Sequence, residues 1–182
     1  MKRLERILVA TDLSENSRNG FLYACSLASD NNATLTLVHV ANELEAWELY
    51  SDEFSFLDRG YQAWPADRVL SEAALELNRF IEPHREAMKQ IPSVGKRVVF
   101  GNVPCAIARV AEQDKSDLVV MSPRRRRKFG RILTGSITDR VTRMSPCPVL
   151  SVMPPLPSRP WRGKVLPVLF GWQRQKAASA HF

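Results

Sequence analysis

The sequence predicts an α/β fold, in which a doubly wound sheet of five parallel strands is covered by helices. Two observations support this prediction. Short apolar runs, each about the length of one buried strand, recur along the chain, and stretches with helical spacing of apolar residues separate them. The beginning of the chain already contains a strand, a helix and a second strand joined by short turns. Units of this kind form parallel sheets with right-handed crossovers, so the whole pattern predicts a doubly wound sheet.

The predicted elements follow one another in chain order. We expect strands at residues 6–11, 34–40, 96–100, 117–121 and 147–152. We expect helices at residues 17–29, 68–90, 104–113 and 135–144. Apolar residues of the first helix, among them Phe21 and Ala24, fall on one face, whereas Gly20 lowers its helix propensity. Pro83 should end or kink the second helix, because proline has no backbone N–H and clashes with the preceding turn.

The composition is typical of a globular protein of the reducing cytosol. With 182 residues, of which 45% are hydrophobic, the chain can bury the core of one domain. Its three cysteines, Cys25, Cys105 and Cys147, are too scattered for a disulfide framework or a metal site, which indicates a cytoplasmic protein. The apolar run at residues 7–10 is too short for a signal sequence or a membrane span. The net charge of +7 favours an anionic partner.

Two segments fall outside the regular pattern of the predicted domain, which covers residues 1–153. The first is an insert at residues 41–67, which is rich in acidic and aromatic residues. It is either a short helix and loop packed on the domain, or a lid or docking surface. The second is a C-terminal extension at residues 154–182, which combines a proline-rich start, an apolar stretch and five lysines and arginines.

The apolar stretch of the extension, residues 165–172, is too short to span a membrane. A free tail with large apolar side chains would promote aggregation. We therefore expect the extension to dock on this domain, on a second subunit or on a partner, with peripheral membrane contact as a further alternative. Its docking residues should be the large aromatic ones, Trp161, Phe170 and Trp172.

A strongly basic run follows the fourth predicted strand and precedes the last predicted helix. Its cations are Arg124, Arg125, Arg126, Arg127, Lys128 and Arg131. A strand that leads into a loop and a helix N-terminus is a natural anion site, because the first helical N–H groups lack partners. The run is either a solvated loop or a partner-binding surface. Its partner would be the acidic insert, an acidic protein or nucleic acid, and few aromatic residues lie nearby to stack on bases.

Four stretches of the chain resemble the universal stress protein family. They read ILVATDLSENS (7–17), TLTLVHV (34–40), DLVVMS (117–122) and GSITDRVTRMSPCPVLSV (135–152). The last is the most specific, since a Gly-Ser that opens a helix is followed by a Cys-Pro-Val strand. The resemblance, which extends over about residues 3–153, implies a five-stranded parallel sheet, a dimer and, in some members, ATP bound at the strand ends.

The resemblance also locates a nucleotide site. ATP-binding members carry G-x-x-G, nine residues and then G-[S/T]; here Ser122 and Arg125 replace the first two glycines, whereas Gly135 and Ser136 are kept. The replacement should weaken the phosphate cradle, because glycine permits positive φ and close approach of phosphate to backbone N–H groups. The other site positions that the resemblance implies are Ala10, Asp12 (adenosine), Val38 (adenine), Met121, Ile137 and Thr138 (metal and phosphate). We therefore expect at most weak binding of ATP or AMP with Mg²⁺.

The resemblance makes the last predicted strand, residues 147–152, an edge strand that pairs with the same strand of a second copy. Pro148 fits an edge, because proline cannot donate a ladder hydrogen bond. An exposed apolar edge would otherwise invite aggregation. The expected contacts of this homodimer are Val149, Leu150 and Val152.

No catalytic set is evident in the sequence. His39, His84 and His181 lie far apart without metal spacing, and His39 should be packed or hydrogen-bonded within its strand. Cys105 begins a predicted helix, where a thiol pKa can fall, but a structural role is favoured. The sequence therefore predicts a non-enzymatic regulatory or docking protein of the universal stress type. A nucleotide-sensing module is the alternative, a nucleic-acid-associated stress protein is third, and a slow ATPase is the remaining enzymatic reading.

Overall fold

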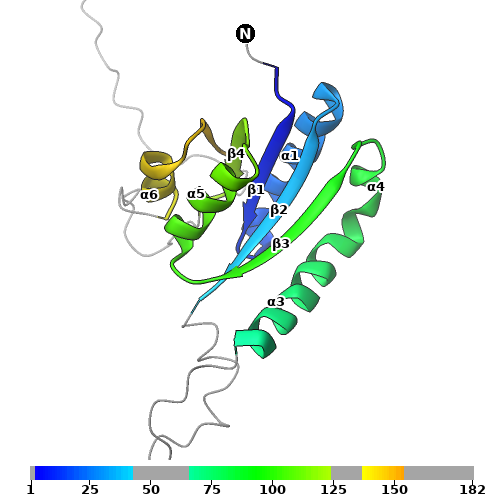
Figure 1. Ribbon diagram of the computed structural model, residues 1–182. Coiled ribbons are helices and arrows are strands. Elements are labelled where there is room, and N and C mark those ends of the chain that lie inside the picture. The colour runs from blue at the N-terminus through cyan, green and yellow to red at the C-terminus, as the bar shows by residue number, and fades with distance from the viewer. Residues whose placement is uncertain (1–2, 43–65, 124–136, 154–182) are drawn as a thin grey trace, which may run out of the picture.

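A five-stranded parallel sheet forms the centre of the molecule (Figure 1). The computed structural model describes residues 3–42, 66–123 and 137–153. The strand order is β3-β2-β1-β4-β5, and all four neighbouring pairs are parallel. The strands are β1 (Arg6–Thr11), β2 (Thr34–Ala41), β3 (Val94–Phe100), β4 (Leu118–Met121) and β5 (Val149–Ser151). The predicted fold class is confirmed.

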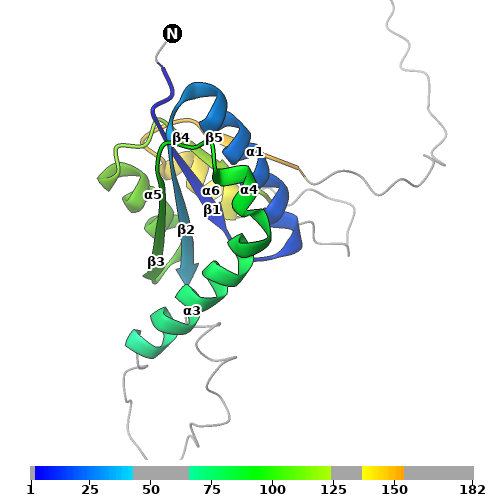
Figure 2. The ribbon, with the colours of Figure 1, turned by 90° about the vertical axis from the view of Figure 1, so that its right-hand side faces the viewer.

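The helices cover both faces of this sheet (Figures 1 and 2). One face carries α1 (Glu15–Asn31), α3 (Ala66–Ile81) and α4 (Arg85–Met88), and the other carries α5 (Val103–Gln113) and α6 (Ile137–Met144). The helix predicted at residues 68–90 is interrupted by a 3-10 turn, η1 (Glu82–His84), which contains Pro83. The expected effect of Pro83 is thus confirmed, because the helix ends directly before it.

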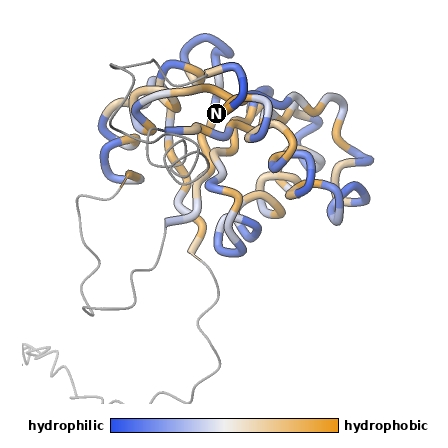
Figure 3. The backbone as a smooth tube through the Cα atoms, turned by 90° about the horizontal axis from the view of Figure 1, so that it is seen from below, coloured by the Kyte–Doolittle hydropathy of each residue, from blue (hydrophilic) through white to orange (hydrophobic). Residues whose placement is uncertain are grey.

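Each face of the sheet has its own hydrophobic core. Alternate strand residues such as Ile7 and Leu8 point to opposite faces and are at most 1% exposed. On the α1 side they pack with Phe21 and Leu77, and on the α5 side with Ile107. In Figure 3 the hydrophobic stretches of the backbone run through the middle and hydrophilic stretches lie at the periphery. Strands that are apolar on both sides are what a sheet between two helical layers requires.

The structure revises several predicted boundaries. The strand predicted at residues 147–152 is limited to β5, whereas β3 begins two residues before its predicted start. The predicted insert is shorter than residues 41–67, because Ala41 ends β2 and Ala66 and Asp67 begin α3. Its remaining residues, 43–65, and the extension at 154–182 lie outside the described residues. Within the described part of the chain, no helix is both long and apolar enough to cross a membrane.

Candidate ligand-binding site

The strand order places a fork at the carboxyl ends of β1 and β4. The chain runs from β1 to β2 and β3 on one side, and then crosses to β4 and β5 on the other. The connection after β1 and the connection after β4 therefore lead to opposite sides of the sheet, so the loops at the carboxyl ends of these two strands diverge. Ala10 of β1 lies opposite Met121 of β4, so residues 11–14 and 122–123 form the described walls of this fork. Ligands of doubly wound sheets bind at such a switch point.

The first wall of the fork is a turn held by side chains. Asp12 accepts hydrogen bonds at Oδ1 from the backbone N–H of Ser14, at 3.1 Å, and from its hydroxyl, at 2.5 Å. Ser14 then caps α1 by accepting from the N–H of Ser17. Leu13, between them, has a φ of +59°, a conformation that is costly for a residue with a side chain. Ser14 is thus the cap of the helix, and Asp12 orients Ser14.

Behind this turn, buried polar groups fix the end of β1. The Thr11 hydroxyl lies 2.9 Å from that of Ser17 and accepts a hydrogen bond from the N–H of Leu13 at 3.0 Å. His39 of β2 is 4% exposed, and its Nδ1 donates to the Thr11 carbonyl at 3.0 Å. The expectation of a packed, hydrogen-bonded His39 is confirmed. These bonds pre-organise the turn, because they leave its backbone few alternative conformations.

The second wall is Ser122, which is bound to α1. Its Oγ accepts a hydrogen bond from the backbone N–H of Gly20 at 3.1 Å. A Cβ at position 20 would lie 2.5 Å from this oxygen, so the glycine permits the close approach. Gly20 is the functional neighbour that sequence reasoning missed, and the glycine within the helical pattern was the available signal. The serine that replaces the first family glycine therefore turns its hydroxyl toward the helix.

The predicted nucleotide-site residues are either at least partly exposed, or buried, or outside the described part of the chain. Asp12 and Ser122 line the fork, and Thr138 lies half-buried on α6, next to Ile137, which is 47% exposed. Ala10 is the penultimate residue of β1, Met121 ends β4, and both are largely buried. Val38 is 0% exposed, because its side chain packs in the α5-side core and β2 continues to Ala41. Val38 was expected to contact the adenine, but it has no accessible surface in this structure. The residues outside the described part of the chain are Arg125, Gly135 and Ser136.

The predicted partner-binding residues also lie outside the described ranges. These are Arg124, Arg125, Arg126, Arg127, Lys128, Arg131, Trp161, Phe170 and Trp172. The described chain does fix where the basic run is attached. Pro123 follows β4 at the fork, and Ile137 begins α6. Both ends of the run are thus tied to elements of the sheet and the α5 side.

Two of the predicted dimer residues, Val149 and Leu150, lie on β5, and Val152 directly follows it. Among the described strands, β5 pairs with β4 alone and is an edge strand. Val149 packs against the α5-side core, and Leu150 and Val152 pack against the α1-side core. Each is half-buried. The Val152 N–H extends the pairing by donating to the Met121 carbonyl at 2.8 Å. The edge position is confirmed, and pairing with a second copy remains a prediction.

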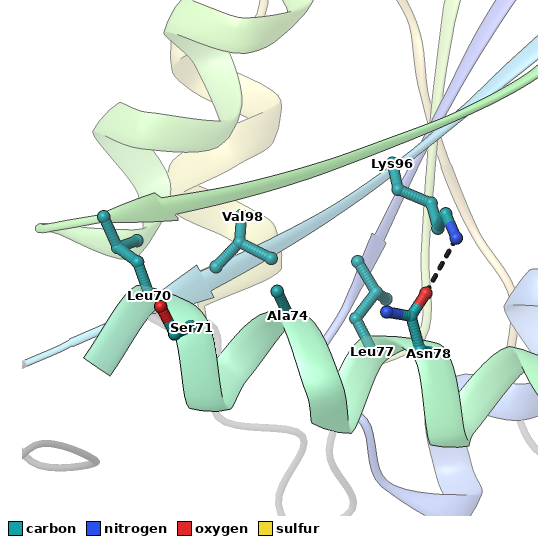
Figure 4. Close-up of a pocket in the computed structure, with 7 residues that line it drawn as sticks. All are labelled: Leu70, Ser71, Ala74, Leu77, Asn78, Lys96 and Val98. Atoms are coloured by element: carbon teal, nitrogen blue, oxygen red, sulfur yellow. Dashed lines mark hydrogen bonds between the residues drawn. The ribbon is translucent and has the colours of Figure 1, made fainter. Parts of the chain in front are cut away.

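A separate groove lies on the flank of the molecule, between α3 and the edge strand β3 (Figure 4). It has a volume of about 420 Å³. Leu70, Ala74 and Leu77 project from α3 toward Val98, while Lys96 Nζ donates to Asn78 Oδ1 at 2.7 Å. Its one charged group is thus already hydrogen-bonded, and the groove lies away from the fork.

Metal-ligating and nucleophilic side chains were the remaining candidates for chemistry in the described residues. Within residues 3–42, 66–123 and 137–153, no three His, Cys, Asp or Glu side chains are grouped to hold a metal ion. Burial raises the pKa of the Cys25 thiol to about 12, so this cysteine is not an available nucleophile. Cys105 is exposed at the start of α5, and its role stays a prediction.

The sequence model that describes the Universal stress protein family matches residues 3–152. The chain belongs to this family. It is 25% identical to a universal stress protein of Methanocaldococcus jannaschii over 159 residues, which cover 83% of each chain. It is also 26% identical to the stress response protein NhaX of Bacillus subtilis over 166 residues, which cover 84% of this chain and 99% of the relative.

Solved structures of the family share the fold. The universal stress protein UspA from Lactobacillus plantarum superposes with a TM-score of 0.61 at 24% identity, covering 84% of this chain and 99% of that one. A universal stress protein solved in complex with cAMP superposes with a TM-score of 0.58 at 22% identity, covering 83% of this chain and 98% of that one. The universal stress protein from Archaeoglobus fulgidus in complex with dAMP superposes with a TM-score of 0.55 at 16% identity, covering 82% of this chain and 98% of that one.

Proposed function

We propose that this universal stress protein is a non-enzymatic regulatory protein of the cytoplasm that binds an acidic protein partner at the carboxyl edge of its sheet. The observation that carries the proposal is the place where the basic run is attached. Five consecutive cations, residues 124–128, follow directly on Pro123, at the fork where this architecture binds its ligands. A dense cluster of like charges repels itself unless an anion neutralises it.

We expect the fold to be independent of these cations. The core on each face of the sheet is filled by apolar residues of the described part of the chain. Exposed charges contribute little to stability, typically about 0–1 kcal/mol for a pair. A protein is favoured over nucleic acid because Phe129 alone, within the basic run, could stack on a base.

The test replaces four arginines, residues 124–127, with serine. We expect the melting temperature to stay nearly unchanged and the capture of acidic proteins in pull-downs from the native cell to fall. Capture by the unaltered protein should also fall with added salt, because exposed charges are screened over about 8–10 Å at 0.1–0.15 M ionic strength. A matched control removes four exposed cations elsewhere, namely Arg79, Arg85, Lys89 and Arg143.

Two results would contradict the docking function. If the serine variant unfolds, the run is structural. If capture survives both the substitution and high salt, the C-terminal extension is the docking element. Equal losses in the serine variant and in the control would show that capture depends on net charge alone.

Adenine nucleotide binding is the second candidate function. It is supported by the pre-organised turn around Asp12 at the fork, and by the complexes of two fold relatives with cAMP and dAMP. Binding should be weak, because Ser122 and Arg125 stand where ATP-binding members have glycine. If Mg²⁺ accompanies the nucleotide, Thr138 is the described residue that could serve its phosphate end. Mass spectrometry of the purified protein, checked for co-purified nucleotide, is the direct measurement.

Assembly as a two-fold dimer through β5 completes the proposal. The half-buried Val149 and Val152 leave apolar surface at this edge. Pairing with the same strand of a second copy would cover it. Light scattering at micromolar concentration should give the mass of a dimer, and the mass of a monomer would refute this assembly.

A further inference from the structure

Residues 82–90, which we call the strap, cross the outer side of α1. The strap comprises η1, α4 and the two residues that follow, and Figure 2 shows α4 beside α1. Ile81 and Ile91, directly before and after it, are both 7% exposed and belong to the α1-side core. The strap is therefore anchored at both ends, and contacts with α1 hold its middle.

The main contact between the strap and α1 is made by His84. Its ring packs on Phe21 of α1, with a centroid distance of 5.8 Å. Farther along, the Ser29 hydroxyl donates to Gln90 Oε1 at 3.3 Å, and Met88 packs against the core. Between α4 and α1 remains a groove of about 410 Å³, whose lining includes the thiol-bearing Cys25. Cys25 itself is 1% exposed.

His84 sits in surroundings that suit only its neutral form. Its Nε2 is buried, and no described residue hydrogen-bonds to it. Arg18 Nε, on α1, is likewise buried and has no hydrogen-bond partner among the described residues. A protonated imidazole carries N–H groups on both ring nitrogens, so the charged ring would bury an unpaired donor.

Burial and one of the two neighbouring charges favour the neutral ring, and the other charge opposes them. Desolvation and the Arg18 guanidinium lower the pKa of His84, and the Glu15 carboxylate opposes them. On the strap, Glu82 pairs with Arg85, and on α3 Glu76 pairs with Arg79. Glu86 pairs with Lys89 in the same way, and all these pairs are exposed. None of these three pairs supplies a buried acceptor to His84.

We propose that the strap is a proton-released cover, which detaches from α1 when His84 is protonated and thereby exposes Cys25. Neutral His84 holds the strap closed at pH values above the ordinary histidine pKa of about 6.5. That hold is lost as the pH falls through the lower pKa of the closed state. The anchors at Ile81 and Ile91 keep the rest of the domain folded. This device is independent of the docking function proposed above.

The experiment measures the accessibility of Cys25 in the full-length protein. The protein is labelled briefly with 4,4′-dithiodipyridine at about pH 7.5 and about pH 5, values on either side of the ordinary histidine pKa. Modification of each cysteine is quantified by peptide mass spectrometry. The Cys25 rate is divided by that of the exposed Cys105 in the same tube, which cancels the pH dependence of the reagent.

We expect this ratio to rise on acidification by about tenfold for each pKa unit that separates the closed and open states. In His84→Leu the ratio should stay constant, since leucine fills the contact with Phe21 and does not titrate. In Arg18→Gln, NMR of the imidazole protons should show a higher His84 pKa in the closed state, and the rise in the ratio should be smaller, because a smaller pKa difference separates the closed and open states.

Three outcomes would overturn the proposal. The first is a ratio that does not change with pH in the unaltered protein. The second is a rise of the same size in His84→Leu or, if that variant does not fold, a rise of undiminished size in Arg18→Gln. The third is loss of the far-ultraviolet circular dichroism signal together with labelling, because global unfolding would then expose Cys25.

Discussion

The two ends of the central strands are held by different kinds of interaction. At the amino ends, Asp117 is 7% exposed, and its Oδ2 accepts hydrogen bonds from the N–H groups of Glu5, at 3.1 Å, and Arg6, at 3.0 Å. Its own N–H donates to the Arg6 carbonyl at 2.8 Å. At the carboxyl ends, the turn around Asp12 is held by short-range side-chain bonds and contains Leu13 at positive φ.

This difference separates stability from ligand binding. The amino end joins β1 to β4 through one carboxylate and needs no ligand. The carboxyl end holds polar side chains in a strained turn, and the basic run is attached beside it. Backbone strain persists where surrounding structure enforces it, commonly at functional sites. Substitutions at the amino end should therefore change folding, and substitutions at the fork should change binding.

The largest effect is expected at the amino end. Asp117→Ala removes the acceptor of two backbone N–H groups and should lower the free energy of unfolding by about 2–3 kcal/mol. Urea denaturation followed by circular dichroism measures the change. Glu76→Gln, which breaks an exposed pair with Arg79, is the control and should cost less than about 1 kcal/mol. Equal losses in the two variants would show that the carboxylate is not the tie between β1 and β4.

The second effect concerns nucleotide binding at the fork. Ser122→Gly combined with Arg125→Gly restores the family glycines, and ATP binding measured by calorimetry should tighten by roughly tenfold, since each regained backbone hydrogen bond contributes about 1 kcal/mol. Arg126→Gly removes the same charge and adds a glycine outside the motif, so it should leave affinity unchanged. Submicromolar ATP binding by the unaltered protein would contradict a weakened phosphate cradle.

The smallest effect concerns the contact between Gly20 and Ser122. In the unaltered background, Gly20→Ala should change stability by less than about 1 kcal/mol, because the gain in helix propensity offsets the lost hydrogen bond to the displaced Ser122 hydroxyl. In the Ser122→Gly background, the same substitution should stabilise by about 1 kcal/mol. A double-mutant cycle by urea denaturation measures this coupling. Additive effects would mean that the two residues do not interact in solution.

The sequence by itself determined the order of strands and helices, because apolar periodicity and strand length are local properties of the chain. The resemblance also placed the candidate nucleotide site at the strand ends, whereas the strand order that creates the fork came from the structure. The break at Pro83 followed from the chemistry of proline alone. Asp12 and Ser122 were expected at the site because the family resemblance places the adenosine-contacting acid and the first motif glycine at these positions.

Only the tertiary structure decided which side chains are accessible and which are bound. It buried Val38, which the sequence assigned to the ligand, and it paired Ser122 with Gly20, 102 residues away. It also revealed the tie between Asp117 and Arg6, which are 111 residues apart. Such contacts depend on packing between elements that are distant in sequence, and local patterns carry no information about the depth of a side chain or about its partner across the sheet.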